Sequence, residues 1–119
     1  MTQENVMVDV AVCGAHMSGL PLNAQLVSLG GEFVKKAKTS LNYKLFKLNG
    51  FTPARPGLLR VIDGGTAIDL EIWRIPLIHY GAFVATVPEP LGFGTLILED
   101  GSKVQGFICE AYATLEAID

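Results

Sequence analysis

The sequence of 119 residues has little charge, few cysteines and no long apolar run. Only 18% of the residues are charged and the formal net charge is −3, so no basic face is available for nucleic acid. The apolar runs fall short of the roughly 18 residues that span a bilayer, and glycine and proline interrupt them. We therefore expect neither nucleic acid nor a membrane as a partner.

Signals for export and for metal binding are also missing. Residues 1–5 lack the basic region and apolar core of a secretory signal, which makes the cytoplasm the expected location. Cys13 and Cys109 stand far apart, and neither has the neighbouring cysteine that a zinc site uses. His16 and His79 without a third ligand do not make a zinc site either. We predict two reduced, buried thiols, no metal and no cofactor.

Apolar residues are abundant: half of the chain is hydrophobic, which at this length suffices for one core. We expect a single domain over residues 1–119. Residues 6–13 carry a valine at every second position, the period of a strand, and predict a central strand. Residues 20–29 predict a short helix, since Pro21 suits a first turn and Gly30 suits a helix end.

Beyond this helix the sequence predicts little further helix and several strands. Two glycine turns, at 63–65 and at 100–101, are typical of hairpins. They would join the strands predicted at 58–62 and 67–75, and those predicted at 95–99 and 103–112.

A further strand pair is predicted for residues 32–39 and 43–48, with loops at 52–57 and 88–92. The predicted fold class is α+β: a curled mixed or antiparallel sheet that approaches a small barrel, with one early helix and few other short helices.

The glycine loop from Gly14 to Gly19 follows the first strand and leads into the predicted helix. Unpaired backbone amides at a helix start favour an anion, so the loop is a candidate carboxylate or phosphate cradle. A sharp turn alone would also explain its glycines. The loop has neither the G-x-G-x-x-G spacing of dinucleotide-binding proteins nor the lysine of a phosphate loop.

His16 lies inside this loop, where an imidazole could act as an acid, a base or a donor to a carboxylate. The alternative is a partly exposed loop histidine with no catalytic task. Ser18 lacks the partners of a nucleophile and fits a helix cap better. Glu110 alternates with buried-looking positions and could orient His16 or satisfy backbone amides. Glu89, between two prolines, could be an acid or a solvated side chain.

Several stretches together resemble the carboxy-terminal domain of allophanate hydrolase, and the resemblance covers nearly the whole chain. The first stretch, residues 10–23, reads VAVCGAHMSGLPLN. The others are residues 56–58, 67–73, 88–95, 100–101 and 106–112.

This resemblance implies a gamma-glutamylcyclotransferase-like fold in which the glycine loop forms the ligand cradle. In that family an amidase domain converts allophanate to N-carboxycarbamate, and the carboxy-terminal domain promotes decarboxylation of this product toward ammonia and carbon dioxide. We therefore expect a hydrolase-like role in urea metabolism, a small carboxylated anion as substrate and His16 as the catalytic residue. The expected substrate-binding residues are Gly14, Ala15, Met17, Ser18, Gly19, Leu20, Asn23, Pro90, Leu91 and Gly92, with Glu89 and Glu110 as candidate supporting acids.

Two features leave other functions open. The sequence has no amidase-signature domain, so we expect a stand-alone domain that depends on a separate amidase, either as its source of substrate or as a partner that it assists without catalysis. The glutamate motif of true gamma-glutamylcyclotransferases is not recognisable, although Glu89 lies close to that region, and cyclotransfer is the third alternative. A small domain rich in apolar residues is also suited to a homodimer.

Overall fold

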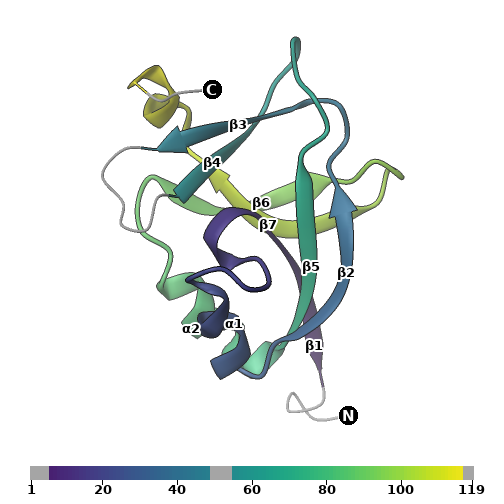
Figure 1. The fold of residues 1–119 in the computed structure, drawn as a ribbon, viewed down its shortest axis with the longest axis vertical. Coiled ribbons are helices and arrows are strands. Elements are labelled where there is room, and N and C mark those ends of the chain that lie inside the picture. The colour runs from purple at the N-terminus through teal and green to yellow at the C-terminus, as the bar shows by residue number, and fades with distance from the viewer. Residues whose placement is uncertain (1–5, 49–54, 117–119) are drawn as a thin grey trace.

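The computed structural model describes residues 6–48 and 55–116, which form curved strands with two α-helices at one end of the molecule (Figure 1). The strands are β1 (Met7–Val12), β2 (Glu32–Lys38), β3 (Tyr43–Leu48), β4 (Arg55–Arg60), β5 (Asp69–Pro76), β6 (Leu91–Ile97) and β7 (Lys103–Cys109). The helices are α1 (Asn23–Ser28) and α2 (Leu77–Ala85), with 3-10 turns η2 (Gly14–His16) and η3 (Ala111–Glu116). The predicted α+β class is confirmed.

β1 is the central strand, as its valines predicted. The five-stranded sheet has the order β2-β5-β1-β7-β6, and β1 runs antiparallel to β5 and parallel to β7. Val10 and Val12 enter one buried apolar cluster, whereas Ala11 and Cys13 enter a second cluster on the other face. Because both faces of β1 are covered, every residue from Val10 to Cys13 is apolar and buried.

The pairing of the shorter strands differs from the prediction. β3 pairs with β4 in a separate two-stranded ribbon, and β2 pairs with β5. Both predicted pairs, 32–39 with 43–48 and 58–62 with 67–75, are therefore wrong. The physical reason lies at Gly65, where a Cβ would sit 2.7 Å from a backbone carbonyl oxygen of the β2–β3 connection. The segment at Gly65 packs against the β2–β3 connection, so β4 and β5 do not form a hairpin with each other. The β6–β7 hairpin is confirmed.

The helices also depart from the prediction. α1 begins at Asn23, later than expected, and ends before Gly30, whose φ of +83° is the left-handed conformation typical of a helix end. α2 and η3 were not predicted. Residues 77–85 are apolar almost throughout, so no amphipathic period marks them, although Phe83 is buried.

The two predicted loops are shorter than expected. The loop at 88–92 gives way to β6 at Leu91, and the loop at 52–57 gives way to β4 at Arg55. Residues 52–54 lie outside the described residues.

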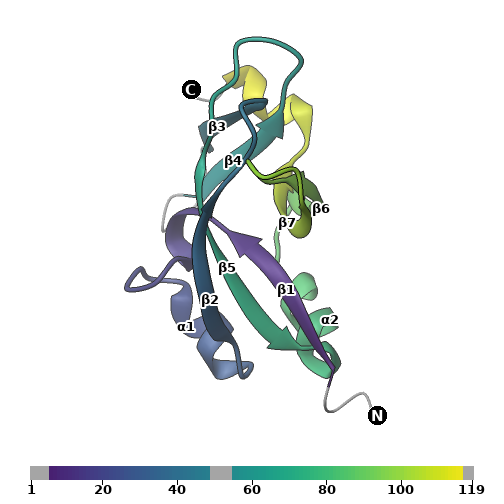
Figure 2. The same cartoon turned by 90° about the vertical axis from the view of Figure 1, so that its right-hand side faces the viewer.

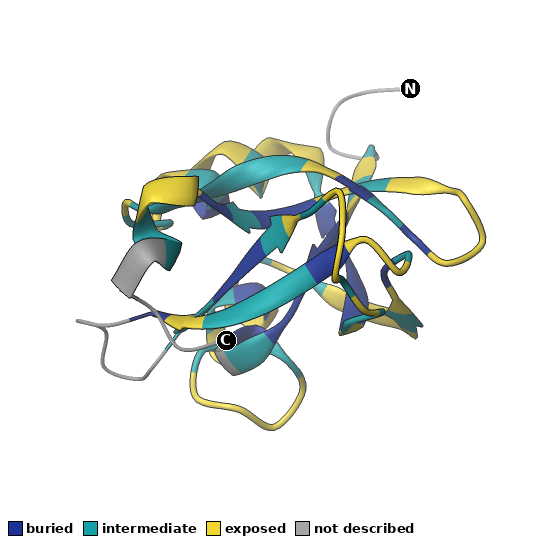
Figure 3. Ribbon diagram, turned by 90° about the horizontal axis from the view of Figure 1, so that it is seen from above, coloured by how far each residue is buried: buried dark blue, intermediate teal, exposed yellow. Residues whose placement is uncertain are grey.

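The sheet curls so that the β3–β4 ribbon lies at one end of the molecule and α1 and α2 lie at the other, with η2 between them (Figure 2). Buried segments lie mainly within the strands, and exposed segments lie mainly in the connections (Figure 3). None of the described helices is long and apolar enough to cross a membrane.

Candidate functional site

His16 is a buried residue and not the partly exposed loop histidine of the alternative interpretation. It ends η2, directly after β1, and is only 5% exposed. Its ring meets Phe83 of α2 edge-on, with centroids 5.8 Å apart, and Phe107 of β7, with centroids 4.9 Å apart. Two separate elements, α2 and β7, therefore place aromatic rings against the imidazole.

Gly14 explains why the chain turns so tightly before His16. Its φ is +68°, and a Cβ at this position would lie 2.5 Å from ring atoms of Pro56 on β4. Only glycine meets both conditions, because other residues rarely adopt this φ and any side chain would collide with the proline. The close approach of η2 to β4 also brings Arg55, the neighbour of Pro56, into the site.

Two polar side chains of α1, Gln25 and Asn23, form hydrogen bonds with His16. The ring nitrogen Nε2 lies 2.9 Å from Oε1 of Gln25. The amide of Asn23 donates to the backbone carbonyl of His16, also at 2.9 Å. The short helix therefore holds both the main chain and the ring of this residue.

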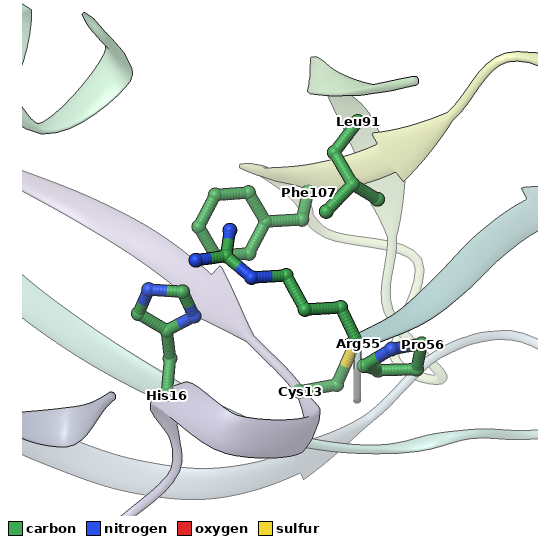
Figure 4. A pocket seen from close by; sticks show the side chains of 6 residues that line it. All are labelled: Cys13, His16, Arg55, Pro56, Leu91 and Phe107. Carbon is green, nitrogen blue, oxygen red and sulfur yellow. The ribbon is translucent and has the colours of Figure 1, made fainter. Parts of the chain in front are cut away.

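A small cavity borders the imidazole (Figure 4). Its free volume is about 10 Å³, enough for about one water molecule. It is lined by Cys13, His16, Arg55, Pro56, Leu91 and Phe107. The Arg55 side chain extends across the cavity toward His16 and the ring of Phe107 (Figure 4).

Burial changes the ionisation of these groups. The pKa of His16 falls below its ordinary value of 6.5 because burial disfavours the imidazolium; the hydrogen bond to Gln25 partly opposes this effect, and the positive charge of Arg55 adds to it. Burial also lowers the pKa of Arg55 and raises the pKa of Cys13 to about 12. At neutral pH the cavity therefore presents a neutral imidazole, a cationic guanidinium and an unreactive thiol.

The amides of the glycine loop are largely occupied by the protein itself. The amide of Met17 donates to the carbonyl of Gly14 at 3.0 Å, and that of Leu20 donates to the carbonyl of Met17 at 3.0 Å. The amide and hydroxyl of Ser18 both donate to Oε1 of Glu71, at 2.8 and 2.9 Å. An outside anion would have to displace these bonds, so the positive charge of the cavity comes from Arg55.

Glu71 is the anion that the loop binds. This carboxylate on β5 is only 4% exposed, and its Oε1 also accepts the indole N–H of Trp73 at 3.0 Å. Burial alone would raise the pKa of Glu71, but the hydrogen bonds from Trp73 and Ser18 outweigh it and the pKa is lowered. Ser18 is therefore not the predicted helix cap; the residue at that position is Leu22.

Most of the predicted binding residues are not among those that line the cavity. Leu91 is the one besides His16 that lines it. Pro90 and Gly92 flank Leu91 at the start of β6, where the carbonyl of Pro90 accepts the amide of Glu110 at 2.9 Å. Ser18, Gly19 and Leu20 are exposed, and Met17 is half-buried. Ala15 belongs to η2.

The two candidate acids lie on the surface. Glu110 follows β7 and is exposed, so the expectation that it is buried is wrong. Glu89 is exposed and accepts a hydrogen bond from the hydroxyl of Tyr112 at 2.8 Å. His79 is exposed on α2, unlike His16.

Three residues of the site were missed by sequence reasoning. Arg55 was assigned to a loop, although it directly precedes a stretch that carries the family resemblance. Gln25 was treated only as part of a helix. Glu71 entered only as part of the strand predicted at 67–75; Trp73, two residues on and therefore on the same face, was the available signal for a buried carboxylate.

The comparison with known families agrees with this geometry. The sequence model of the allophanate hydrolase C-terminal domain matches residues 8–119. The chain belongs to this family. The resemblance stated from the glycine loop and the later stretches is therefore confirmed.

Relatives of this chain include both much longer proteins and a protein of similar length. Urea amidolyase of Lachancea kluyveri is 45% identical over 107 residues, which cover 88% of this chain and 6% of that protein. Allophanate hydrolase of Kluyveromyces lactis superposes with a TM-score of 0.89 at 45% identity, over 94% of this chain and 19% of the other. A uropathogenic E. coli-specific protein superposes with a TM-score of 0.86 at 37% identity, over 94% of this chain and 86% of the other.

More distant structures share the fold alone. A gamma-glutamyl cyclotransferase superposes with a TM-score of 0.65 at 9% identity, over 88% of this chain and 68% of the other. The predicted gamma-glutamylcyclotransferase-like fold is confirmed, and no activity follows from this likeness.

Proposed function

We propose that this allophanate hydrolase C-terminal domain binds a small carboxylated, urea-derived anion such as N-carboxycarbamate beside His16 and Arg55, and promotes its decarboxylation. The observation that carries the proposal is that one cavity is lined by both a buried imidazole and a guanidinium. Membership of the family, with relatives named allophanate hydrolase and urea amidolyase, supports this class of substrate.

Arg55 is the group that recognises the anion in this proposal. A guanidinium matches a carboxylate in charge and in the spacing of its donors, and burial strengthens the attraction. The cavity has a free volume of about 10 Å³, so the Arg55 and Leu91 side chains must move to admit the substrate. The apolar ring of Phe107 then excludes water from one side of the anion.

His16 supplies the proton that the reaction needs. In N-carboxycarbamate one carbon–nitrogen bond breaks, its electron pair goes to the nitrogen, the nitrogen takes a proton, and carbon dioxide and carbamate form. Burial favours a neutral imidazole, but a bound dianion raises the pKa of His16 because it stabilises the imidazolium. His16 thus takes a proton from solvent when substrate binds and passes it to the nitrogen. The carbamate then takes a second proton and breaks down to carbon dioxide and ammonia.

The test is carbon dioxide release from N-carboxycarbamate that a separate amidase generates from allophanate. We expect the purified domain to accelerate release, and we expect Arg55→Gln and His16→Gln to abolish most of the acceleration, by roughly 100-fold or more. Arg60→Gln is the matched control, since Arg60 is exposed at the other end of β4 and does not line the cavity. It should retain the full rate.

Two outcomes would overturn this proposal. One is that the wild-type domain has no effect on the rate of release. The other is that the domain co-purifies with the amidase, and that the wild-type domain and the His16→Gln variant raise the rate of the amidase equally. The domain would then be a non-catalytic partner.

A further inference from the structure

Gln25 contacts the imidazole of His16 from outside the cavity. It lies on α1, is half-buried, and places Oε1 at 2.9 Å from Nε2 of His16. It is not among the residues that line the cavity. Any influence of Gln25 on a bound anion must therefore pass through His16.

The chemistry of this contact determines which ring nitrogen carries hydrogen. An amide oxygen can only accept a hydrogen bond, so Nε2 of His16 must be the donor. In a neutral imidazole the other nitrogen, Nδ1, is then left as the acceptor. Figure 4 shows Nδ1, the ring nitrogen next to the carbon that carries the side chain, on the side of the ring toward Cys13, and the guanidinium of Arg55 beyond the ring edge between the two nitrogens.

We propose that Gln25 is a positioning residue that holds His16 as the Nε2–H tautomer and so leaves Nδ1 as the atom that exchanges a proton with the bound anion. The catalytic part of this inference, proton exchange with a bound anion, rests on the proposed function. The tautomer rests on the contact with Gln25 alone. Asn23, two residues earlier on α1, fixes the carbonyl of His16, so the same helix sets both the position and the protonation pattern of the residue.

Among the residues that the structure describes, the titratable or charged groups beside the ring are Arg55 of β4 and the thiol of Cys13 after β1. α2 and β7 place the rings of Phe83 and Phe107 against the imidazole. Among the described residues, Gln25 is thus the side chain whose hydrogen bond to the ring can select the tautomer.

The direct test is nitrogen-15 NMR of protein labelled in its histidine rings, without substrate. The chain has only two histidines, so exposed His79 serves as an internal reference. We expect His16 to show a protonated Nε2 and an unprotonated Nδ1. In Gln25→Met this signature should give way to a mixture of tautomers, whereas Val27→Ala, an exposed position on the same helix, should keep it. An Nδ1–H tautomer in the wild type, or an unchanged signature in Gln25→Met, would overturn the inference.

Activity and its pH dependence provide a second test on the same variants. Gln25→Met should lower kcat roughly tenfold or more with little change in KM, because Gln25 does not touch the substrate. Gln25→Glu should restore most of kcat and move the alkaline limb of the pH profile upward, since a carboxylate beside Nε2 favours the imidazolium. A rise in KM alone would contradict the assigned role.

The two proposals can fail separately. If the tautomer changes as expected and the wild-type domain does not accelerate carbon dioxide release, the role of Gln25 toward His16 stands and the proposed function falls. If the wild-type domain accelerates carbon dioxide release and the His16 tautomer is unchanged in Gln25→Met, the proposed function stands and the role of Gln25 falls.

Discussion

His16 illustrates how burial changes the chemistry of a side chain that the sequence places in a loop. Its place in a glycine loop left open a partly exposed histidine, but contacts with Phe83, Phe107 and Gln25 leave only 5% of it exposed. Burial then favours a neutral ring over an imidazolium. Under the proposed function, the imidazolium that delivers the proton would therefore have to form when the anion binds.

Glu71 shows the same principle for a negative charge. Three donors, two from Ser18 and one from Trp73, converge on Oε1 and hold the carboxylate ionised although it is buried. The anion that the sequence predicted for the glycine loop is thus supplied by the protein itself. Its role is to hold the segment that follows His16 against β5.

The lowered pKa of His16 predicts how stability depends on pH. Between the lowered folded pKa and the ordinary value of 6.5, the unfolded chain binds more protons than the folded chain. The free energy of unfolding should therefore be highest above about pH 6.5 and should fall as the pH is lowered through this window. Urea denaturation at a series of pH values measures the free energy of unfolding across this window. His16→Gln should flatten this part of the curve, and equal slopes for both proteins would refute the prediction.

At the scale of elements, the site depends on the contact between η2 and β4. The tight turn at Gly14 lets Pro56 approach, and the approach carries Arg55 to the cavity. β4 belongs to the β3–β4 ribbon and not to the five-stranded sheet. The cavity is therefore assembled from both β units of the fold together with η2.

Gly14→Ala tests this contact. We expect it to lower the free energy of unfolding by roughly 2 kcal/mol or more, because strain from a positive φ and a collision with Pro56 act together. Gly19→Ala is the matched control: its φ is +78°, but a Cβ there meets nothing within 4 Å, so only the backbone strain of roughly 1 kcal/mol applies. Urea denaturation gives the free energy of unfolding of Gly14→Ala and of Gly19→Ala for comparison. Equal losses would show that the Pro56 contact contributes nothing.

At the scale of the whole molecule, two apolar clusters share one strand. The first includes Leu58 of β4 and the second includes Leu26 of α1, and β1 contributes alternate residues to both. Because no described element separates the two clusters except the sheet that contains β1, loss of either should weaken the other. The molecule should therefore unfold as one cooperative unit.

Leu58→Ala and Leu26→Ala should each destabilise the whole domain by about 2–5 kcal/mol, since both side chains are fully buried. The single tryptophan, Trp73, lies in the second cluster, so its fluorescence reports on that cluster while far-UV circular dichroism reports on the whole sheet. The two signals should give the same midpoint in both variants. Separate midpoints in Leu58→Ala would show that the clusters unfold independently.

The central strand, the α+β class and the family could all be predicted from local features of the sequence. The valine alternation of β1, the turn at Gly101 and the stretch around His16 are each contained within a few residues, so no knowledge of distant contacts was needed. The pairing of β2, β3, β4 and β5 was not predictable in this way. The local pattern of each strand does not identify its partner, which depends on contacts such as that of Gly65 with a distant connection.

By itself, the sequence determined that a glycine turn carries a histidine at the end of a central strand in a member of this family. Only the tertiary structure decided what surrounds that histidine. Arg55, Gln25 and Phe107 come from β4, α1 and β7, and their convergence depends on long-range packing that no local pattern encodes. The same packing buries the ring and the Glu71 carboxylate, and burial is what sets the ionisation of both.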